Sequence, residues 1–138
     1  MEISNDKFLE YFENQTLPPD LFDHWGHLRL AWLYLRKYPL QIAIDKVTTG
    51  IKVYANSLGA TNKFQHTLTE AIVRIMAIRM KKKDADTLEA YLADNQDLVE
   101  DISAVVATHY SYDLLNSERA RTEFVSPDLA EITTLEAV

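Results

Sequence analysis

The sequence predicts an all-α protein, a single-domain helical bundle of five to seven helices, and two observations support this class. The 138 residues include only three glycines and four prolines, and such low turn content favours long helices over many short strands. Apolar residues also recur at steps of three and four along most of the chain, which is the period of a helix with one buried face. The length suits one domain over residues 1–138.

Capping residues and a proline divide the first part of the chain into helices. Ser4 is the predicted N-cap of a helix that runs to about Asn14. A second helix opens at Asp20 or Asp23 and ends at Tyr38-Pro39. Its apolar seam comprises Leu21, Trp25, Leu28, Trp32 and Leu35. Because leucines also lie on its other side, we expect this helix to be the most buried, with Trp32 in the core.

The middle of the chain continues the helical pattern. A third helix follows Pro39 and stops at Gly59, and Thr61 or Asn62 is the expected cap of a fourth. The fourth helix ends near Lys81-Lys82-Lys83, where cations suit the negative end of the helix dipole.

Shorter helices are expected towards the C-terminus. One covers about residues 86–94, a longer one is capped by Asn95 and reaches His109, and a last one begins at Ser117. Phe124 and Leu129 are expected to pack back onto the bundle, followed by a mobile C-terminal tail after about residue 130.

Composition and charge exclude several classes of protein. A net charge of −7 argues against a nucleic-acid partner, and no apolar run is long enough to cross a bilayer. The absence of cysteine excludes disulfides, thiolate metal sites and cysteine nucleophiles. The three glycines are scattered, so no phosphate-binding loop is present and no nucleotide cofactor is expected. Because the N-terminus also lacks the pattern of a secretion signal, we expect a cytoplasmic protein.

Three motifs carry a resemblance to a known family. They read HxxHLRLAWxYL over residues 24–35, KFQHTLT over 63–69, and HYSxxLLxSxxARxxFVxPDL over 109–129. Together they resemble a family of small bacterial all-helical proteins of no established function, and the resemblance implies a helical fold in the cytoplasm. The middle motif of that family reads Lys-Tyr-His-Glu-Thr, whereas this chain has Gln65 at the His position and His66 at the Glu position.

Two histidines at the start of the second helix form the first candidate site. His24 and His27 are three residues apart, so they project from neighbouring positions on the helix. Asp20 and Asp23 each precede one of them by four residues, and a carboxylate at that spacing can hold one ring nitrogen. The alternative is structural, with both rings bonded to carboxylates or backbone near the helix start.

A second pair lies on the fourth helix, where His66 and Glu70 share one face at a spacing of four. If that face meets the His24 and His27 face, three imidazoles and a carboxylate converge. Such a set suits Zn²⁺, or Fe²⁺ and Mn²⁺ if further oxygens join. The alternative is an ordinary ion pair along the helix. His109 is expected to serve as a cap or an interhelical contact.

Two classes of function compete. The favoured one is a small-molecule-binding or self-associating protein, with a homodimer as one form of self-association. The alternative is a His-centred enzyme, using either a divalent metal held by His24, His27 and His66, or His27 with Asp23 as a general base. The residues expected to line the polar pocket are His24, His27, His66, Glu70, Asp23 and Tyr34.

Overall fold

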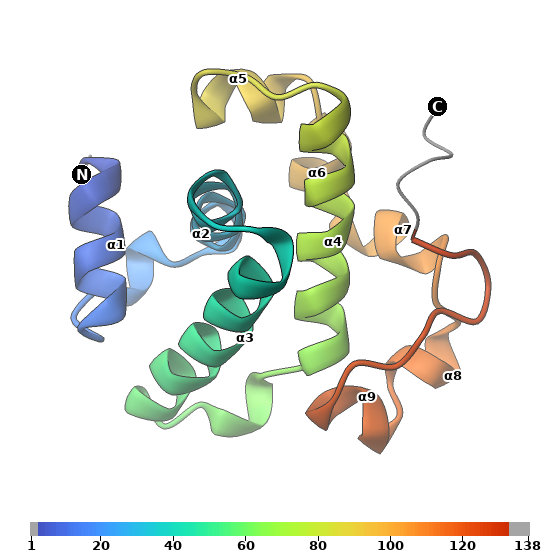
Figure 1. Cartoon of the computed structure of the whole chain (residues 1–138). Coiled ribbons are helices and arrows are strands. Elements are labelled where there is room, and N and C mark those ends of the chain that lie inside the picture. The colour runs from blue at the N-terminus through green and yellow to red at the C-terminus, as the bar shows by residue number, and fades with distance from the viewer. Residues whose placement is uncertain (1–2, 133–138) are drawn as a thin grey trace. The chain divides into compact units, whose positions relative to one another are not determined.

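The computed structural model describes residues 3–132, and over these residues the chain is all-helical, as predicted (Figure 1). The described part holds nine α-helices, so the predicted count of five to seven was wrong. The elements are α1 (Asn5–Glu13), η1 (Pro19–Leu21), α2 (His24–Lys37), α3 (Leu40–Ser57), η2 (Thr61–Lys63), α4 (His66–Lys82), α5 (Leu88–Ala93), α6 (Gln96–Glu100), α7 (Ile102–Ala107), α8 (Tyr112–Leu115) and α9 (Glu118–Thr122), where η marks a 3-10 helix.

Two side-chain caps account for the extra helices. The helix predicted from Asn95 to His109 is split at Asp101, which ends α6 and accepts a hydrogen bond from the Ala104 amide to begin α7. Ser111 likewise accepts a hydrogen bond from the Leu114 amide and starts α8, a single turn that was not predicted. A short polar side chain therefore begins each of these helices, and at Asp101 it does so where the apolar period continues without a break.

The fourth helix starts later than predicted. Neither Thr61 nor Asn62 caps it, because both lie in the separate turn η2. The N-cap is Gln65, whose side-chain oxygen accepts a hydrogen bond from the Leu68 amide at 2.6 Å. Glutamine is an unusual cap, and its longer side chain does here what Ser or Asp does at most helix starts.

The chain divides into two compact units, Met1–Phe64 and Gln65–Val138. The predicted single domain and bundle arrangement stay predictions. The expected mobile tail falls largely on residues 133–138, which lie outside the described residues. Among the described residues, no helix is both long and apolar enough to cross a membrane.

The first unit is built from α1, α2 and α3, whose ends match the predicted signals closely. Ser4 caps α1 and Asp23 caps α2, while α2 stops before Tyr38 and Pro39. The α3 helix packs against both α1 and α2. Between them lies an aromatic cluster of Phe12, Phe22 and Tyr54, with ring centroids 4.9–5.6 Å apart.

The α2 seam is confirmed at its centre and corrected at its start. Trp32 is 2% exposed and Leu28 is 1% exposed, as expected for a core helix. Trp25 is 39% exposed, so its predicted place in the seam was wrong. It lies in the first turn of α2, before the buried face of the helix begins.

In the second unit, short helices pack on the long helix α4. A core cluster joins Ala71 of α4 to Val106, Tyr110, Ala120 and Val125. The buried Thr67 hydroxyl donates to the carbonyl of Glu123 at 2.7 Å and accepts from the Val125 amide at 3.1 Å. This one hydroxyl therefore fixes the segment after α9 to the first turn of α4.

The C-terminal segment packs back as predicted, but not through the predicted pair. Phe124 is half-buried under the Arg74 guanidinium, whereas Leu129 is 59% exposed. Val125 and the partly buried Ile132 contact the core cluster instead. The Leu129 amide donates to the carbonyl of His109, so the backbone at this position is fixed while the side chain lies in solvent.

The two tryptophans provide a matched test of the α2 seam. We expect Trp32→Ala to lower the free energy of unfolding by about 3–5 kcal/mol, because it leaves a large cavity in the core. Trp25→Ala removes the same atoms from an exposed position and should cost less than about 1 kcal/mol. Urea unfolding followed by circular dichroism measures both, and equal losses in the two variants would contradict the assignment.

Candidate functional site

The first predicted pair, His24 and His27, lies in the first turn of α2 in the first unit. The His27 ring stacks on Phe22 with centroids 4.0 Å apart. Its Nδ1 lies 2.8 Å from the backbone carbonyl of Asp23, and because a carbonyl only accepts, Nδ1 carries the hydrogen. The neutral ring then presents its lone pair on Nε2, as a general base requires.

Loss of water on the face covered by Phe22 lowers the pKa of His27, although the residue as a whole stays partly in solvent. The hydrogen bond to the Asp23 carbonyl opposes this shift, and the nearby His24 adds to it. The predicted role of the Asp23 carboxylate was wrong, because it accepts the Gly26 amide at 2.9 Å as the helix cap. The backbone of Asp23, not its side chain, orients the ring.

Tyr34, another predicted pocket residue, is buried and serves the structure of the first unit. Its hydroxyl donates to the Glu13 carboxylate at 2.5 Å and so ties α2 to the end of α1. Burial and the neighbouring carboxylate raise the pKa of Tyr34 well above its ordinary value. The hydroxyl therefore keeps its proton and acts as a donor.

The second predicted pair forms on α4 in the second unit. His66 Nε2 lies 2.9 Å from Glu70 Oε1, as the spacing predicted. The other oxygen of Glu70 accepts from Arg74 Nε at 2.9 Å and pairs with its Nη2 at 2.8 Å. Glu70 is only 6% exposed, so the two partners compensate a buried carboxylate. This geometry matches the structural alternative for the pair, an ion pair along one helix.

The structure places the two pairs in different units, and their convergence in one pocket stays a prediction. Within the part of the chain that the structure describes, no group of three or more His, Asp or Glu side chains is arranged to hold a metal ion. His27, His66 and His109 each use a ring nitrogen in a contact with a protein oxygen.

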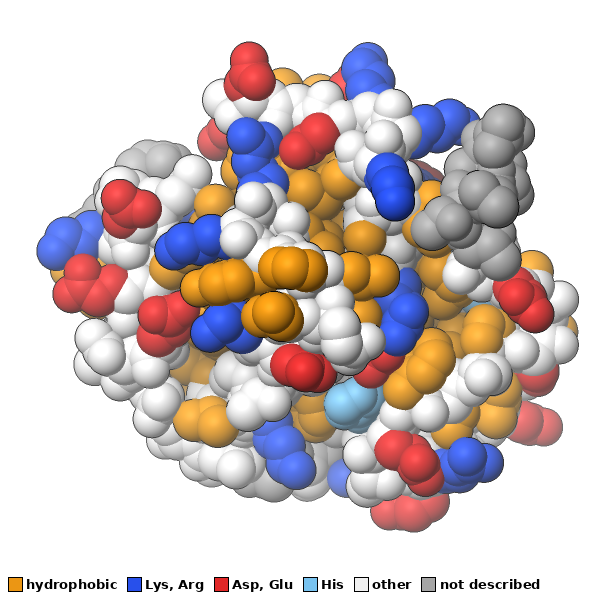
Figure 2. Space-filling view, viewed as in Figure 1, with side chains coloured by type: hydrophobic (Ala, Val, Ile, Leu, Met, Phe, Trp, Pro, Cys, Tyr) orange, Lys and Arg blue, Asp and Glu red, His pale blue; other side chains and the backbone are white. Residues whose placement is uncertain are grey.

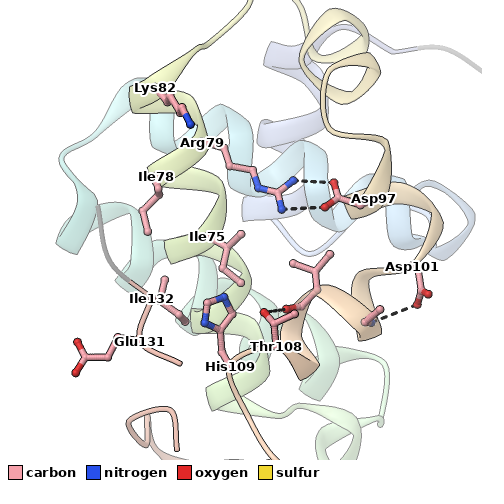
Figure 3. A pocket seen from close by; sticks show the side chains of 12 residues that line it. Ile75, Ile78, Arg79, Lys82, Asp97, Asp101, Thr108, His109, Glu131 and Ile132 are labelled. Atoms are coloured by element: carbon pink, nitrogen blue, oxygen red, sulfur yellow. Dashed lines mark hydrogen bonds and ion pairs between the residues drawn. The ribbon is translucent and has the colours of Figure 1, made fainter. Parts of the chain in front are cut away.

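The second unit contains a hollow of about 660 Å³ beside α4, which sequence reasoning missed (Figure 3). Its walls come from α4, α6, α7 and the segment around residues 131–132. Most of the lining surface is apolar, although seven of the twelve lining residues have polar or charged side chains. The lining residues are Ile75, Ile78, Arg79, Lys82, Asp97, Asp101, Ala104, Val105, Thr108, His109, Glu131 and Ile132.

An ion pair forms one wall of the hollow. The Arg79 guanidinium binds Asp97 through two parallel contacts of 2.7 and 2.9 Å and also donates to Asn95 at 3.2 Å. This pairing raises the pKa of Arg79 and lowers the pKa of Asp97, so both groups stay charged. Figure 3 shows the pair above the apolar side chain of Ile75.

His109 lies at the other side of the hollow, close to Ile75 and Thr108 (Figure 3). Its Nδ1 is 2.7 Å from the carbonyl of Ala130 and therefore carries the hydrogen. The contact joins the residues after α7 to the last described segment, which is not helical, so it is neither the helix cap nor the interhelical contact that was predicted. The second nitrogen, Nε2, is the acceptor of the neutral ring.

The hollow was missed because its residues lie in three separate stretches of the chain and follow no common period. One signal was present in the sequence: Arg79 occurs on a largely apolar helix and needs an anionic partner. That signal predicts a charged neighbour, but it does not show that the neighbour is Asp97 or that a hollow opens beside the pair.

No protein-family model matches the sequence, and no curated protein or solved structure is significantly similar to the chain. The family resemblance of the three motifs stays a prediction.

The stacked geometry of His27 predicts a pH effect on stability. Because its pKa is lower in the folded protein than in the unfolded chain, the unfolded chain takes up the proton first as the pH falls. The neutral His27 ring contributes fully to the stability of the fold above about pH 6.5, which is the ordinary pKa of histidine in the unfolded chain. This contribution is lost as the pH falls through the lower pKa of His27 in the folded protein.

An NMR titration of the His27 ring measures this directly, and a pKa at or above its ordinary value would contradict the stacking argument. Urea unfolding at several pH values gives a second measurement. We expect His27→Gln, which cannot titrate, to show a smaller fall in stability between about pH 7 and about pH 5 than the parent protein.

Proposed function

We propose that this protein binds a small, mainly apolar molecule in the hollow beside α4. The observation that supports this proposal is the volume of the hollow together with the side chains that line it. A volume of about 660 Å³ falls within the usual range of ligand pockets, about 300–1,000 Å³. Isoleucine and valine side chains provide apolar contact area, and a few fixed polar groups provide orientation, which is the usual composition of such pockets.

The polar groups restrict the ligand further. The Arg79 and Asp97 charges satisfy each other, so the ion pair offers a polar wall without an unpaired charge. Lys82 at one edge and the His109 ring at another provide a donor and an acceptor beside the apolar floor. We expect a ligand with an apolar body and a polar or anionic end that reaches Lys82.

Filling the hollow with a larger side chain tests the proposal. Ala104 lines the hollow, whereas Ala107 lies three residues further along the same helix and does not; both are exposed. With the dye 8-anilinonaphthalene-1-sulfonate as probe, which has an apolar body and an anionic end, we expect Ala104→Trp to weaken binding by at least about tenfold. A loss of about 1.4 kcal/mol in binding free energy corresponds to that factor. Ala107→Trp should bind like the parent.

Fluorescence titration of the full chain measures the affinities, and urea unfolding shows that both tryptophan variants remain folded. Equal affinity in the two variants would place the dye elsewhere and would overturn the proposal. Absence of saturable binding to the parent protein would overturn it as well.

A second candidate function, a His-centred enzyme, is favoured by one observation at His27. The ring has a fixed tautomer and a lowered pKa, so it is neutral near pH 7 and Nε2 is its basic nitrogen. The metal-dependent form of this candidate uses His24, His27 and His66. Metal analysis of protein purified without an affinity tag tests it: one equivalent of zinc, iron or manganese that is lost in His27→Ala supports it, and an absence of bound metal rejects it.

A further inference from the structure

The junction of α2 and α3 in the first unit carries exposed apolar and basic side chains together. Leu40 is 39% exposed and Ile42 is 46% exposed at the start of α3. Figure 2 shows hydrophobic side chains gathered over the first turns of α3, with basic side chains beside them. We define the basic corner as Arg36, Lys37, Leu40, Ile42 and Lys46.

Two of the three cations of the basic corner, Arg36 and Lys46, lie over aromatic rings. The Arg36 guanidinium lies 4.6 Å from the centroid of Trp32, and the Lys46 ammonium lies 5.0 Å from the centroid of Tyr38. Residues 24–64 contain six Lys and Arg residues but only one acidic residue. The corner is therefore a positively charged site on a chain whose net charge is −7.

The second unit carries a surface of the opposite charge. Two chain segments are tied together where the Ser111 hydroxyl donates to the Asp128 carboxylate at 2.6 Å and the Leu129 amide donates to the His109 carbonyl at 3.0 Å. The side chains of Tyr112 and Leu129 are 79% and 59% exposed there. We define the acidic strap as Tyr112, Asp113, Asp128, Leu129 and Glu131.

Charge in the surrounding sequence strengthens the acidic strap. Residues 84–138 contain thirteen Asp and Glu residues and only two Lys and Arg residues. The hydrogen bonds from Ser111 lower the pKa of Asp128, so this carboxylate stays charged. The strap thus combines large exposed apolar side chains with negative charge, whereas the corner combines them with positive charge.

We propose that the basic corner of one copy of this chain binds the acidic strap of a second copy. Charge complementarity determines the choice of partner, because like-charged surfaces repel and these two surfaces carry opposite charges around exposed apolar groups. An anionic bilayer would match the corner alone, whereas a second copy matches both surfaces. The contact joins two different surfaces, so it can repeat head to tail and form a ring or a chain of copies.

Charge reversal tests the proposal on the full chain. We expect sedimentation velocity to show association that increases with protein concentration and weakens at high salt, because exposed charges are screened. Lys37→Glu with Lys46→Glu reverses the corner, and Asp113→Lys with Glu131→Lys reverses the strap. Each of these two double substitutions should raise the dissociation constant for self-association by about tenfold or more. All four substitutions in one chain should restore it, since the charges are then exchanged.

A matched control uses Lys7→Glu with Lys63→Glu, two exposed positions of the first unit outside the corner. This control changes the net charge by the same amount and should associate like the parent protein. A monomer at every concentration and salt level would overturn the proposal, and so would failure of the fourfold exchange to restore association in a folded chain. Binding of the corner to anionic vesicles by a protein that does not self-associate would also overturn it, in favour of a membrane surface.

Discussion

The second unit depends on one long helix, α4, because the helices that follow it are too short to be stable alone. Isolated helices of four to six residues lose more entropy than their few hydrogen bonds recover, so they need tertiary contacts. The Tyr91 hydroxyl of α5 bonds the Met76 carbonyl of α4, and Asp97 of α6 pairs with Arg79 of α4. The hollow exists because these short helices meet α4 at separate points along its length.

Polar side chains near the start of α4 stabilise the second unit, and some of them belong to the middle motif over residues 63–69. Thr67 is fully buried and satisfies two backbone groups of the C-terminal segment. Glu70 is buried between His66 and Arg74, and removal of Arg74 would take away the cation that compensates this buried carboxylate. The described contacts of Gln65, His66 and Thr67 in this motif lie within the second unit and stabilise its packing.

Local signals in the sequence predicted the first unit well and the second unit less well. Ser4, Asp23 and Tyr38 mark helix ends that depend only on neighbouring residues, and the 3.6-residue period placed Trp32 in the core. The break at Asp101 interrupts no apolar pattern, so periodicity alone passes over it, and the single turn that begins at Ser111 is too short to show a period. The hollow forms where α4 packs against segments that come much later in the chain. The spacing of residues along the sequence therefore does not predict it.

Gln65 joins two distant parts of the second unit through a single side-chain amide. Its oxygen accepts the Leu68 amide at the start of α4, and its nitrogen donates to the Leu115 carbonyl at the end of α8. An amide has no proton to gain near neutral pH, whereas an imidazole in that position changes charge between pH 5 and 8. The joint between α4 and α8 consequently keeps the same donor and acceptor in mildly acidic and in neutral surroundings, and acidification leaves this attachment of α8 intact.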